Sequence, residues 1–197
     1  MFRTLIFLFL FAPTVFGQTA MERERDFYNC DTVQITEPEL RLELLAMAEV
    51  DQEARVDPES DLLAVDKENT DKLSEMLQIH DWLDISMVGC DGSDAAWLIA
   101  QHADFDLSVQ GAALERLEAA VSRDQATPSQ LAYLTDRVRV NRGQKQVYGT
   151  QFHTVDGELV PQPIENRETV DERRAAVGLT ALAEYSQQMK ELYGEGD

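Results

Sequence analysis

Apolar residues recur at helical spacing through most of this chain, and this periodicity limits the fold more than any other feature of the sequence. Polar residues of the kind that cap helices divide the pattern into segments. Thr36 and Glu39 fit a capping box, which predicts a helix over about 38–56. Asp66 is placed to cap a second helix over 67–79. These segments predict a mainly α-helical fold.

The helical pattern continues through the middle of the chain. Residues 88–92 (VGCDG) predict a turn, and a long apolar-periodic stretch over 93–121 follows, with an expected break near Asp104. Thr127 and Gln130 form another capping box with a proline between them, which predicts a helix to about residue 140. The first two thirds of the chain therefore reads as a set of helices.

The pattern then changes from helical to strand-like. Residues 146–155 resemble a strand, and the Asp-Gly pair at 156–157 is typical of a two-residue hairpin turn that returns through 158–160. Because an isolated hairpin is only marginally stable in water, it must pack on the helices. The sequence predicts one β-hairpin at about 146–160.

A last helix is expected after the hairpin, because Thr169 and Glu172 fit a third capping box and the helical pattern runs to about residue 192. We therefore expect a single compact helical domain over 36–193 with one late hairpin. An irregular segment over 18–35 should precede it.

The N-terminus has the layout of a secretory signal peptide. Residues 1–17 (MFRTLIFLFLFAPTVFG) contain one basic residue, a short apolar run and a final small residue. The run is shorter than the roughly 20 apolar residues that span a bilayer. We expect cleavage after Gly17 and export to the periplasm or the extracellular space, with an uncleaved membrane anchor as the alternative.

The charge of the chain excludes some classes of partner. The formal net charge is −20, and removal of residues 1–17, which contain Arg3 and no acid, would make it −21. Such a surface repels nucleic acid and anionic lipid. We expect no nucleic-acid partner and no stable membrane insertion after signal cleavage. Many exported proteins carry an acidic surface without an acid-specific task.

The chain has two cysteines, Cys30 and Cys90. In an oxidising compartment they could pair and close a loop of about 60 residues, which would stabilise the fold by roughly 3–4 kcal/mol. Two buried thiols are the alternative.

Ionisable residues fall on the apolar faces of three predicted helices. Asp51 lies in the apolar stripe of the first helix with Arg55 one turn later, His102 and Asp106 lie near the middle of the central apolar face, and Arg174 lies among apolar residues of the last helix. Since burial of an unpaired charge is very costly, these groups should meet each other. We expect His102 to contact Asp106, and Asp51 to meet Arg55 or Arg174.

A second polar segment is QKQVYGTQFH at 144–153. Gly149 within a strand usually marks a bulge or a close approach of two backbones. The hydrogen-bonding side chains around it, Tyr148 and Gln151 among them, suggest a strand edge that lines a pocket. An ordinary polar edge strand with a bulge fits the same residues.

Motifs of common catalytic classes are missing from the sequence: it has no GxSxG, HExxH, P-loop, EF-hand loop or GxGxxG. His102 and Asp106 have the spacing of metal ligands on a helix, but this spacing often arises by chance. We assign no metal, and the cofactor is unknown.

Five segments together resemble a bacterial family of unknown function, number 6624: 43–55 (ELLAMAEVDQEAR), 95–104 (AAWLIAQHAD), 131–138 (LAYLTDRV), 146–152 (QVYGTQF) and 170–179 (VDERRAAVGL). The resemblance covers roughly residues 40–185 and implies one compact domain. It implies no activity, cofactor or catalytic residue.

The sequence supports two hypotheses about function. In the first, the protein is a hydrolase or group-transfer enzyme that acts on an unknown small-molecule or envelope-derived ligand. Its catalytic residues would be His102 as general base with Asp106 or Asp51, and its substrate-binding residues Arg174, Gln151, Tyr148, Gln101 and Arg55. In the second, it is a non-catalytic binding module of the cell envelope, and the polar cluster only stabilises the fold.

Overall fold

The computed structural model describes residues 30–193, so the expected signal peptide and most of the 18–35 segment lie outside the described residues. In this range the chain forms seven α-helices and one antiparallel two-stranded hairpin, which confirms the mainly α prediction. The elements are η1 (Cys30–Thr32), α2 (Pro38–Val56), α3 (Leu62–Ile79), α4 (Ile85–His102), α5 (Leu107–Val121), α6 (Pro128–Asn141), β1 (Phe152–Val155), β2 (Glu158–Pro161), η2 (Arg167–Thr169), α7 (Val170–Ala176) and α8 (Leu182–Tyr193).

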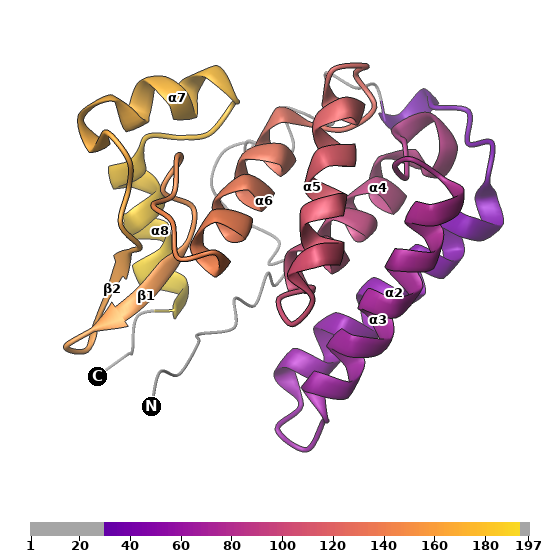
Figure 1. Cartoon of the computed structure of the whole chain (residues 1–197), viewed down its shortest axis with the longest axis horizontal. Coiled ribbons are helices and arrows are strands. Elements are labelled where there is room, and N and C mark those ends of the chain that lie inside the picture. The colour runs from indigo at the N-terminus through magenta and orange to yellow at the C-terminus, as the bar shows by residue number, and fades with distance from the viewer. Residues whose placement is uncertain (1–29, 194–197) are drawn as a thin grey trace.

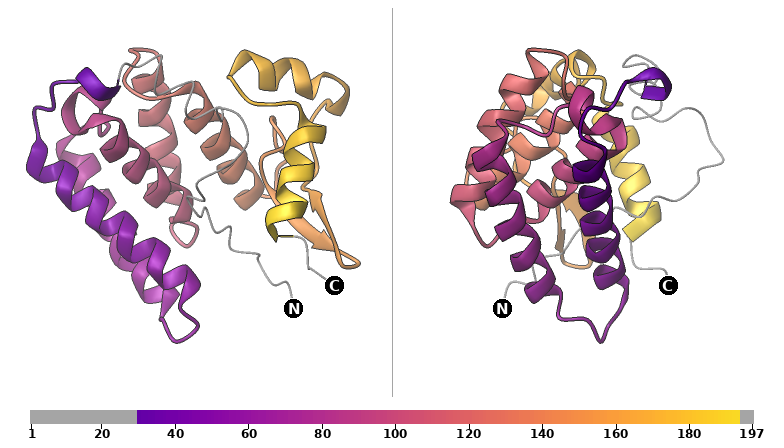
Figure 2. Two further views of the ribbon diagram at one scale, coloured as in Figure 1. Left: turned by 180° about the vertical axis from the view of Figure 1, so that it is seen from behind. Right: turned by 90° about the vertical axis from the view of Figure 1, so that its right-hand side faces the viewer.

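Helix α4 is the centre of a bundle formed by α2 to α6. It contacts α2, α3, α5 and α6, and nearly all of its residues are buried. The hairpin, α7 and α8 lie on the side of α6 that is away from α2 and α3 (Figure 1). Figure 2 shows the same arrangement from behind and from the side. Because α4 lies at the centre of the bundle, a buried polar residue on α4 must find its partners inside the bundle.

A second apolar cluster joins the hairpin to α8. Phe152 of β1 and Leu159 of β2 pack with Tyr185 of α8, and Tyr133 of α6 packs against them. The rings of Tyr133 and Tyr185 meet edge-on with centroids 6.1 Å apart. The hairpin is thus held by α6 and α8, as expected for a pair of strands that is unstable alone.

The capping signals predicted some helix starts correctly. Thr127 and Gln130 form the complete capping box at the start of α6. At α2, however, the N-cap is Glu37 and makes no side-chain capping bond, so the box predicted from Thr36 is wrong. The box predicted from Thr169 is also wrong, because that side chain bonds the carbonyl of Asn166 instead.

Three helix boundaries differ from the predictions. Helix α3 begins at Leu62 and is capped by Asp61, so Asp66 lies inside the helix. The expected last helix is two helices, because Gly178 between them has φ +78°, a conformation that interrupts an α-helix. The predicted turn at 88–92 is a kink within α4, at Gly89. The break near Asp104 is confirmed, since α4 ends at His102 and α5 begins at Leu107.

Cys30 and Cys90 form a disulfide with their Cα atoms 5.7 Å apart. The bond fastens the segment before α2 to the kinked start of α4, directly after Gly89. The predicted pairing is therefore confirmed.

Candidate functional site

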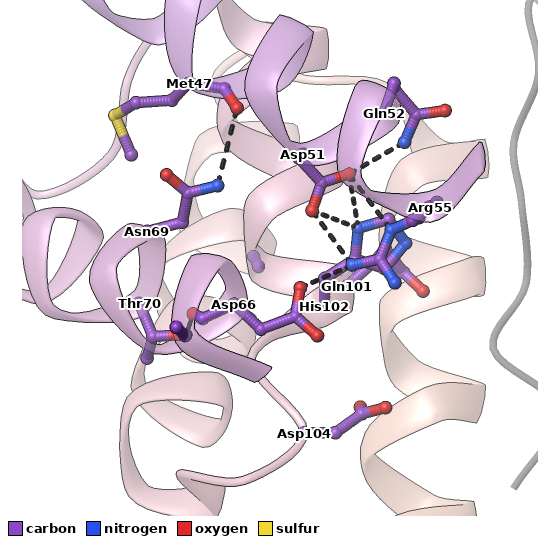
Figure 3. A network of polar contacts seen from close by, with 12 residues as sticks. Met47, Asp51, Gln52, Arg55, Asp66, Asn69, Thr70, Gln101, His102 and Asp104 are labelled. Atoms are coloured by element: carbon purple, nitrogen blue, oxygen red, sulfur yellow. Dashed lines mark hydrogen bonds and ion pairs between the residues drawn. The ribbon is translucent and has the colours of Figure 1, made fainter. Parts of the chain in front are cut away.

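The candidate site lies where α2 passes the C-terminal end of α4. Asp51 of α2 is fully buried, and His102 is the last residue of α4 and is 4% exposed. The Nδ1 atom of His102 lies 2.9 Å from each carboxylate oxygen of Asp51 (Figure 3). Asp51, the polar residue in the apolar stripe of α2, thus contacts His102, the polar residue at the end of α4.

Arg55 and Gln52 complete the shell around the Asp51 carboxylate. Arg55, one turn along α2, donates from Nε and from one terminal nitrogen over 3.1 and 2.9 Å. The Gln52 amide donates over 2.7 Å. Burial would raise the pKa of Asp51, but the hydrogen bonds from His102 and Arg55, together with the charge of Arg55, outweigh burial and lower it to about 2. Asp51 is therefore ionised at neutral pH.

Burial favours the neutral form of His102. Burial lowers its pKa, and this effect exceeds the opposing influence of Asp51. Because ionised Asp51 can only accept hydrogen bonds, the proton of the neutral ring belongs on Nδ1, which leaves a lone pair on Nε2. Among the described residues, Nε2 has no hydrogen-bond partner. The arrangement is that of a carboxylate that orients an imidazole as a base.

Asp66 of α3 joins the same cluster. The terminal nitrogen of Arg55 that contacts Asp51 also lies 2.6 Å from Asp66 Oδ1. The Asp66 side chain is 16% exposed, whereas that of Asp51 is sealed. Burial raises the pKa of Asp66 to about 6, against the opposing charge of Arg55. Sequence analysis missed this residue because it was interpreted as a helix cap.

A second polar network adjoins the first just beyond α4. Asp104 accepts hydrogen bonds from Arg137 at 2.9 Å, Asn141 at 2.8 Å and Gln110 at 3.0 Å. Burial opposes its ionisation, but these donors outweigh it and lower its pKa. The charge of Arg137 helps to lower the pKa of His102, and the charge of Asp104 helps to raise that of Asp66, so the two networks influence each other.

Gln151 and Gln101, two of the predicted substrate-binding residues, lie beside these networks. Gln151 accepts a hydrogen bond from Arg137 over 3.3 Å, which links it to Asp104. The Gln101 side-chain oxygen is placed to accept the backbone N–H of Leu134 in α6 at 2.8 Å. Gln101 therefore serves the packing of α4 against α6.

The predicted contact between His102 and Asp106 is wrong. The two residues do not share a helix, because α4 ends at His102 and Asp106 is the N-cap of α5. The Asp106 carboxylate accepts hydrogen bonds from the backbone of Ser108 and Val109 and so stabilises the start of α5. Asp106 thus does not join the cluster.

Arg174 lies in a different part of the molecule, so of the two partners expected for Asp51 the structure shows Arg55 and not Arg174. Arg174 belongs to α7, which is far from α2 in Figure 1. Its guanidinium donates to the backbone carbonyls of Thr180 and Tyr148, the latter over 2.7 Å, and lies 4.9 Å from the centre of the Tyr185 ring. Arg174 holds the backbone of the 148 segment, and Arg55 is the partner of Asp51.

The segment QVYGTQF folds around a buried carboxylate. Asp136 of α6 accepts backbone hydrogen bonds from Val147, Tyr148 and Thr150 over 2.7–3.0 Å. The Thr150 hydroxyl adds a fourth donor at 3.0 Å. The strand begins only at Phe152, so the predicted strand over 146–155 is too long. This segment therefore wraps around a side chain of its own chain, Asp136.

Gly149 allows this wrapped loop to form. Its φ of +73° is unfavourable for other residues, and a Cβ atom there would lie 2.8 Å from Leu182 and 2.9 Å from Ile164. Gly149 precedes β1, and its close neighbours are the side chains of Leu182 and Ile164 and not a second backbone, so the expected bulge or backbone approach within a strand is not found at this position.

Two features are absent from the described residues. Within 30–193, no group of three or more His, Cys, Asp or Glu side chains is placed to hold a metal ion. No helix in the same range is long and apolar enough to cross a membrane.

These features define a class: a helical-bundle protein with a buried His–Asp–Arg cluster at the C-terminal end of its central helix. By sequence, the chain belongs to the "Family of unknown function (DUF6624)", which it matches over residues 38–196. Comparison with curated proteins and with solved structures gave no match.

Proposed function

We propose that this protein is an exported hydrolase or group-transfer enzyme in which His102 is the general base. The observation that carries the proposal is the contact of His102 Nδ1 with both oxygens of buried Asp51, while Nε2 has no partner among the described residues. A neutral imidazole held in this way accepts a proton at Nε2 from water or a substrate hydroxyl. The lowered pKa of His102 keeps it in that state.

The other residues of the cluster have supporting roles in this proposal. Asp51 fixes the ring orientation and stabilises the imidazolium that forms when His102 takes a proton. Arg55 keeps Asp51 ionised and in place. Of the predicted substrate-binding residues, Gln151 stays a candidate because Arg137 links it to Asp104, which follows α4 directly.

Export is supported by two observations. Residues 1–17 have the composition of a signal peptide, and the Cys30–Cys90 disulfide is of the kind that persists in oxidising compartments. The substrate would then be a molecule of the periplasm or of the extracellular space.

The proposal is tested by activity against chromogenic carboxylic esters, phosphate esters, glycosides and amides. We expect the disulfide-intact protein to hydrolyse one of these classes and His102→Gln to lower kcat at least about 100-fold, the size of a lost general base. His153→Gln, on the half-buried strand β1, is the matched control and should leave kcat unchanged. A folded His102→Gln protein with wild-type kcat would overturn the assignment.

The protonation state of His102 is tested without a substrate. The chain has three histidines, so the ¹⁵N spectrum of histidine-labelled protein is simple, and the His102→Gln spectrum assigns the signals. We expect His102 to carry its proton on Nδ1 near pH 7. A protonated imidazolium, or a proton on Nε2, would contradict the role of general base.

The second candidate function is a binding module, and a different observation favours it. Large apolar side chains of α2 and α3 are exposed: Leu42 at 61%, Leu63 at 68% and Ile79 at 78%. In that case His102 and Gln151, only 4% and 5% exposed, would serve stability alone. Inactivity of the wild-type protein against all substrate classes, with a loss of stability in His102→Gln, would favour this function.

A further inference from the structure

We propose that Asp66 is a second catalytic residue, the general acid that gives a proton to the leaving group while His102 takes one from water. This inference rests on the proposed function, because it assigns the other half of the same acid–base reaction. It depends on two observations. The Arg55 guanidinium donates to both Asp51 and Asp66, which differ in burial and in number of hydrogen bonds, and Asp66 Oδ2 has no hydrogen-bond partner among the described residues.

Arg55 serves two carboxylates with one terminal nitrogen. That nitrogen donates to Asp51 at 2.9 Å and to Asp66 at 2.6 Å, while Nε binds Asp51 alone. Asp51 therefore receives two bonds from Arg55, a contact from His102 and a bond from Gln52, whereas Asp66 receives a single side-chain bond. The charge of one arginine does not neutralise both acids.

A proton added to this cluster binds most readily to Asp66. Asp51 is sealed and its four contacts favour the charged form, but the Asp66 side chain is 16% exposed and its Oδ2 has no hydrogen-bond partner among the described residues. The negative charges of Asp51 and Asp104 also oppose the ionisation of Asp66. The pKa of Asp66, raised to about 6 chiefly by burial, agrees with this geometry.

Asp66 belongs to the same cluster as His102. Its Oδ1 is joined to the His102 ring through Arg55 and Asp51 (Figure 3). In the proposed reaction the two residues act on one substrate, with neutral His102 as the base and the protonated form of Asp66, which is favoured below about pH 6, as the acid.

The proposed reaction is balanced by water alone. His102 Nε2 removes a proton from water as the water oxygen forms a bond to the electrophilic atom of the substrate. The bond from that atom to the leaving group breaks, and the leaving atom takes the proton from Asp66 Oδ2. The proton on His102 then returns to Asp66 through solvent, so both residues recover their starting states.

The test compares substrates that have the same acyl, phosphoryl or glycosyl part but different leaving groups. A leaving group such as 4-nitrophenolate needs no proton, whereas an alkoxide does. We expect Asp66→Asn to keep kcat/KM within about threefold for the nitrophenyl substrate and to lower it at least about 100-fold for the alkyl substrate. Asp71→Asn, at an exposed position on α3, is the matched control and should change neither value.

The pH profile gives a second measurement. In the wild-type enzyme kcat/KM for the alkyl substrate should fall as pH rises above about 6, because ionised Asp66 has no proton to give. Asp66→Asn should lose this dependence. The charged groups that act on Asp66 are Arg55 and Asp51 on α2 and Asp104 beyond α4. Because Asp51 also contacts His102, His102→Gln is profiled in parallel.

Failure of this inference is distinguishable from failure of the proposed function. Equal loss of activity on both substrates in Asp66→Asn, or no loss on either, would overturn the role of Asp66 while His102→Gln still shows a general base. Full activity of His102→Gln on both substrates would overturn the proposed function itself.

Discussion

Asp51 and Asp136 are both fully buried carboxylates, yet their surroundings differ in kind. Asp51 faces charged or ionisable partners, Arg55 and His102, and its pKa falls to about 2. Asp136 faces backbone N–H groups and the hydroxyl of Thr150, and burial dominates and raises its pKa. Charged partners stabilise the ionised form more than neutral donors do. The comparison indicates that the Asp136 cluster holds a loop, whereas the Asp51 cluster joins ionisable side chains of two helices.

The largest effect is expected at Asp136. In Asp136→Asn, one oxygen becomes an NH₂ group that faces backbone donors, so several buried N–H groups lose their acceptor. We expect the free energy of unfolding to fall by about 3–5 kcal/mol, measured by urea denaturation. Asp71→Asn, which is exposed, should stay within about 0.5 kcal/mol of wild type. A loss below about 1 kcal/mol would show that the loop does not depend on the carboxylate.

The next largest loss of stability is expected from a change at Gly149, in the loop that Asp136 holds. Gly149→Ala adds a Cβ at φ +73° and within 2.9 Å of two side chains, so we expect a loss of about 3 kcal/mol. Gly157 in the hairpin turn has φ +85° with no atom near its added Cβ, and Gly157→Ala isolates the backbone cost at about 1 kcal/mol. Equal losses in the two variants would contradict tight packing at Gly149.

The free energy of unfolding at low pH should depend on the protonation of Asp51. The pKa of Asp51 is about 2 in the folded protein and near 4 in an unfolded chain. Its carboxylate therefore stabilises the fold fully above about pH 4, and this contribution, about 2.5 kcal/mol, is lost as pH falls towards 2. Urea denaturation of wild type and Asp51→Asn between pH 5 and 2 should show a larger loss in wild type, and the difference between the two losses is the contribution of Asp51, because Asp104 also has a lowered pKa in both proteins. If Asp51→Asn does not fold, ¹³C titration of the Asp51 carboxyl in wild type gives the same answer, and a pKa near 4 would contradict it.

Much of the fold follows from local signals in the sequence. Capping at Thr127 and the turn at 156–157 were predicted correctly, because each depends on residues within one turn of chain. Helical phase also identified Asp51 and His102 as inward-facing. The split between α7 and α8 was missed, since the sequence signal for it, Gly178, lies within an otherwise continuous helical pattern.

The partners of those inward-facing residues could not be predicted in the same way. Phase gives the direction of a side chain around its helix, but the pairing of Asp51 with His102 depends on which helices cross and at what height. Arg174 satisfied the phase argument equally well and lies with Tyr148 and Tyr185 instead. Asp66 and Asp136 give no separate signal, because an acid on a half-buried helix is most often a cap or a surface residue.

The smallest expected change in the free energy of unfolding is at Asp66, and it is a gain in stability where the other variants lose stability. It is also the sharpest test of whether the Asp51–Asp66 cluster and the Asp136 cluster serve different purposes. The pKa of Asp66 is raised to about 6, so the protonated form is favoured in the fold, and stability falls as pH rises from about 4 through 6. Asparagine resembles the protonated acid. We therefore expect Asp66→Asn to be more stable than wild type by about 1–2 kcal/mol at pH 7, after allowance for the lost contact with Arg55, and nearly equal to it at pH 4. Urea denaturation at both pH values, with Asp71→Asn as control, measures this difference.

A fold that is destabilised at neutral pH by the Asp66 carboxylate would indicate that Asp66 is kept for chemistry, whereas Asp136 is required by the fold. If Asp66→Asn were less stable than wild type at pH 7, Asp66 would instead be a stabilising partner of Arg55, and both clusters would have the same structural purpose.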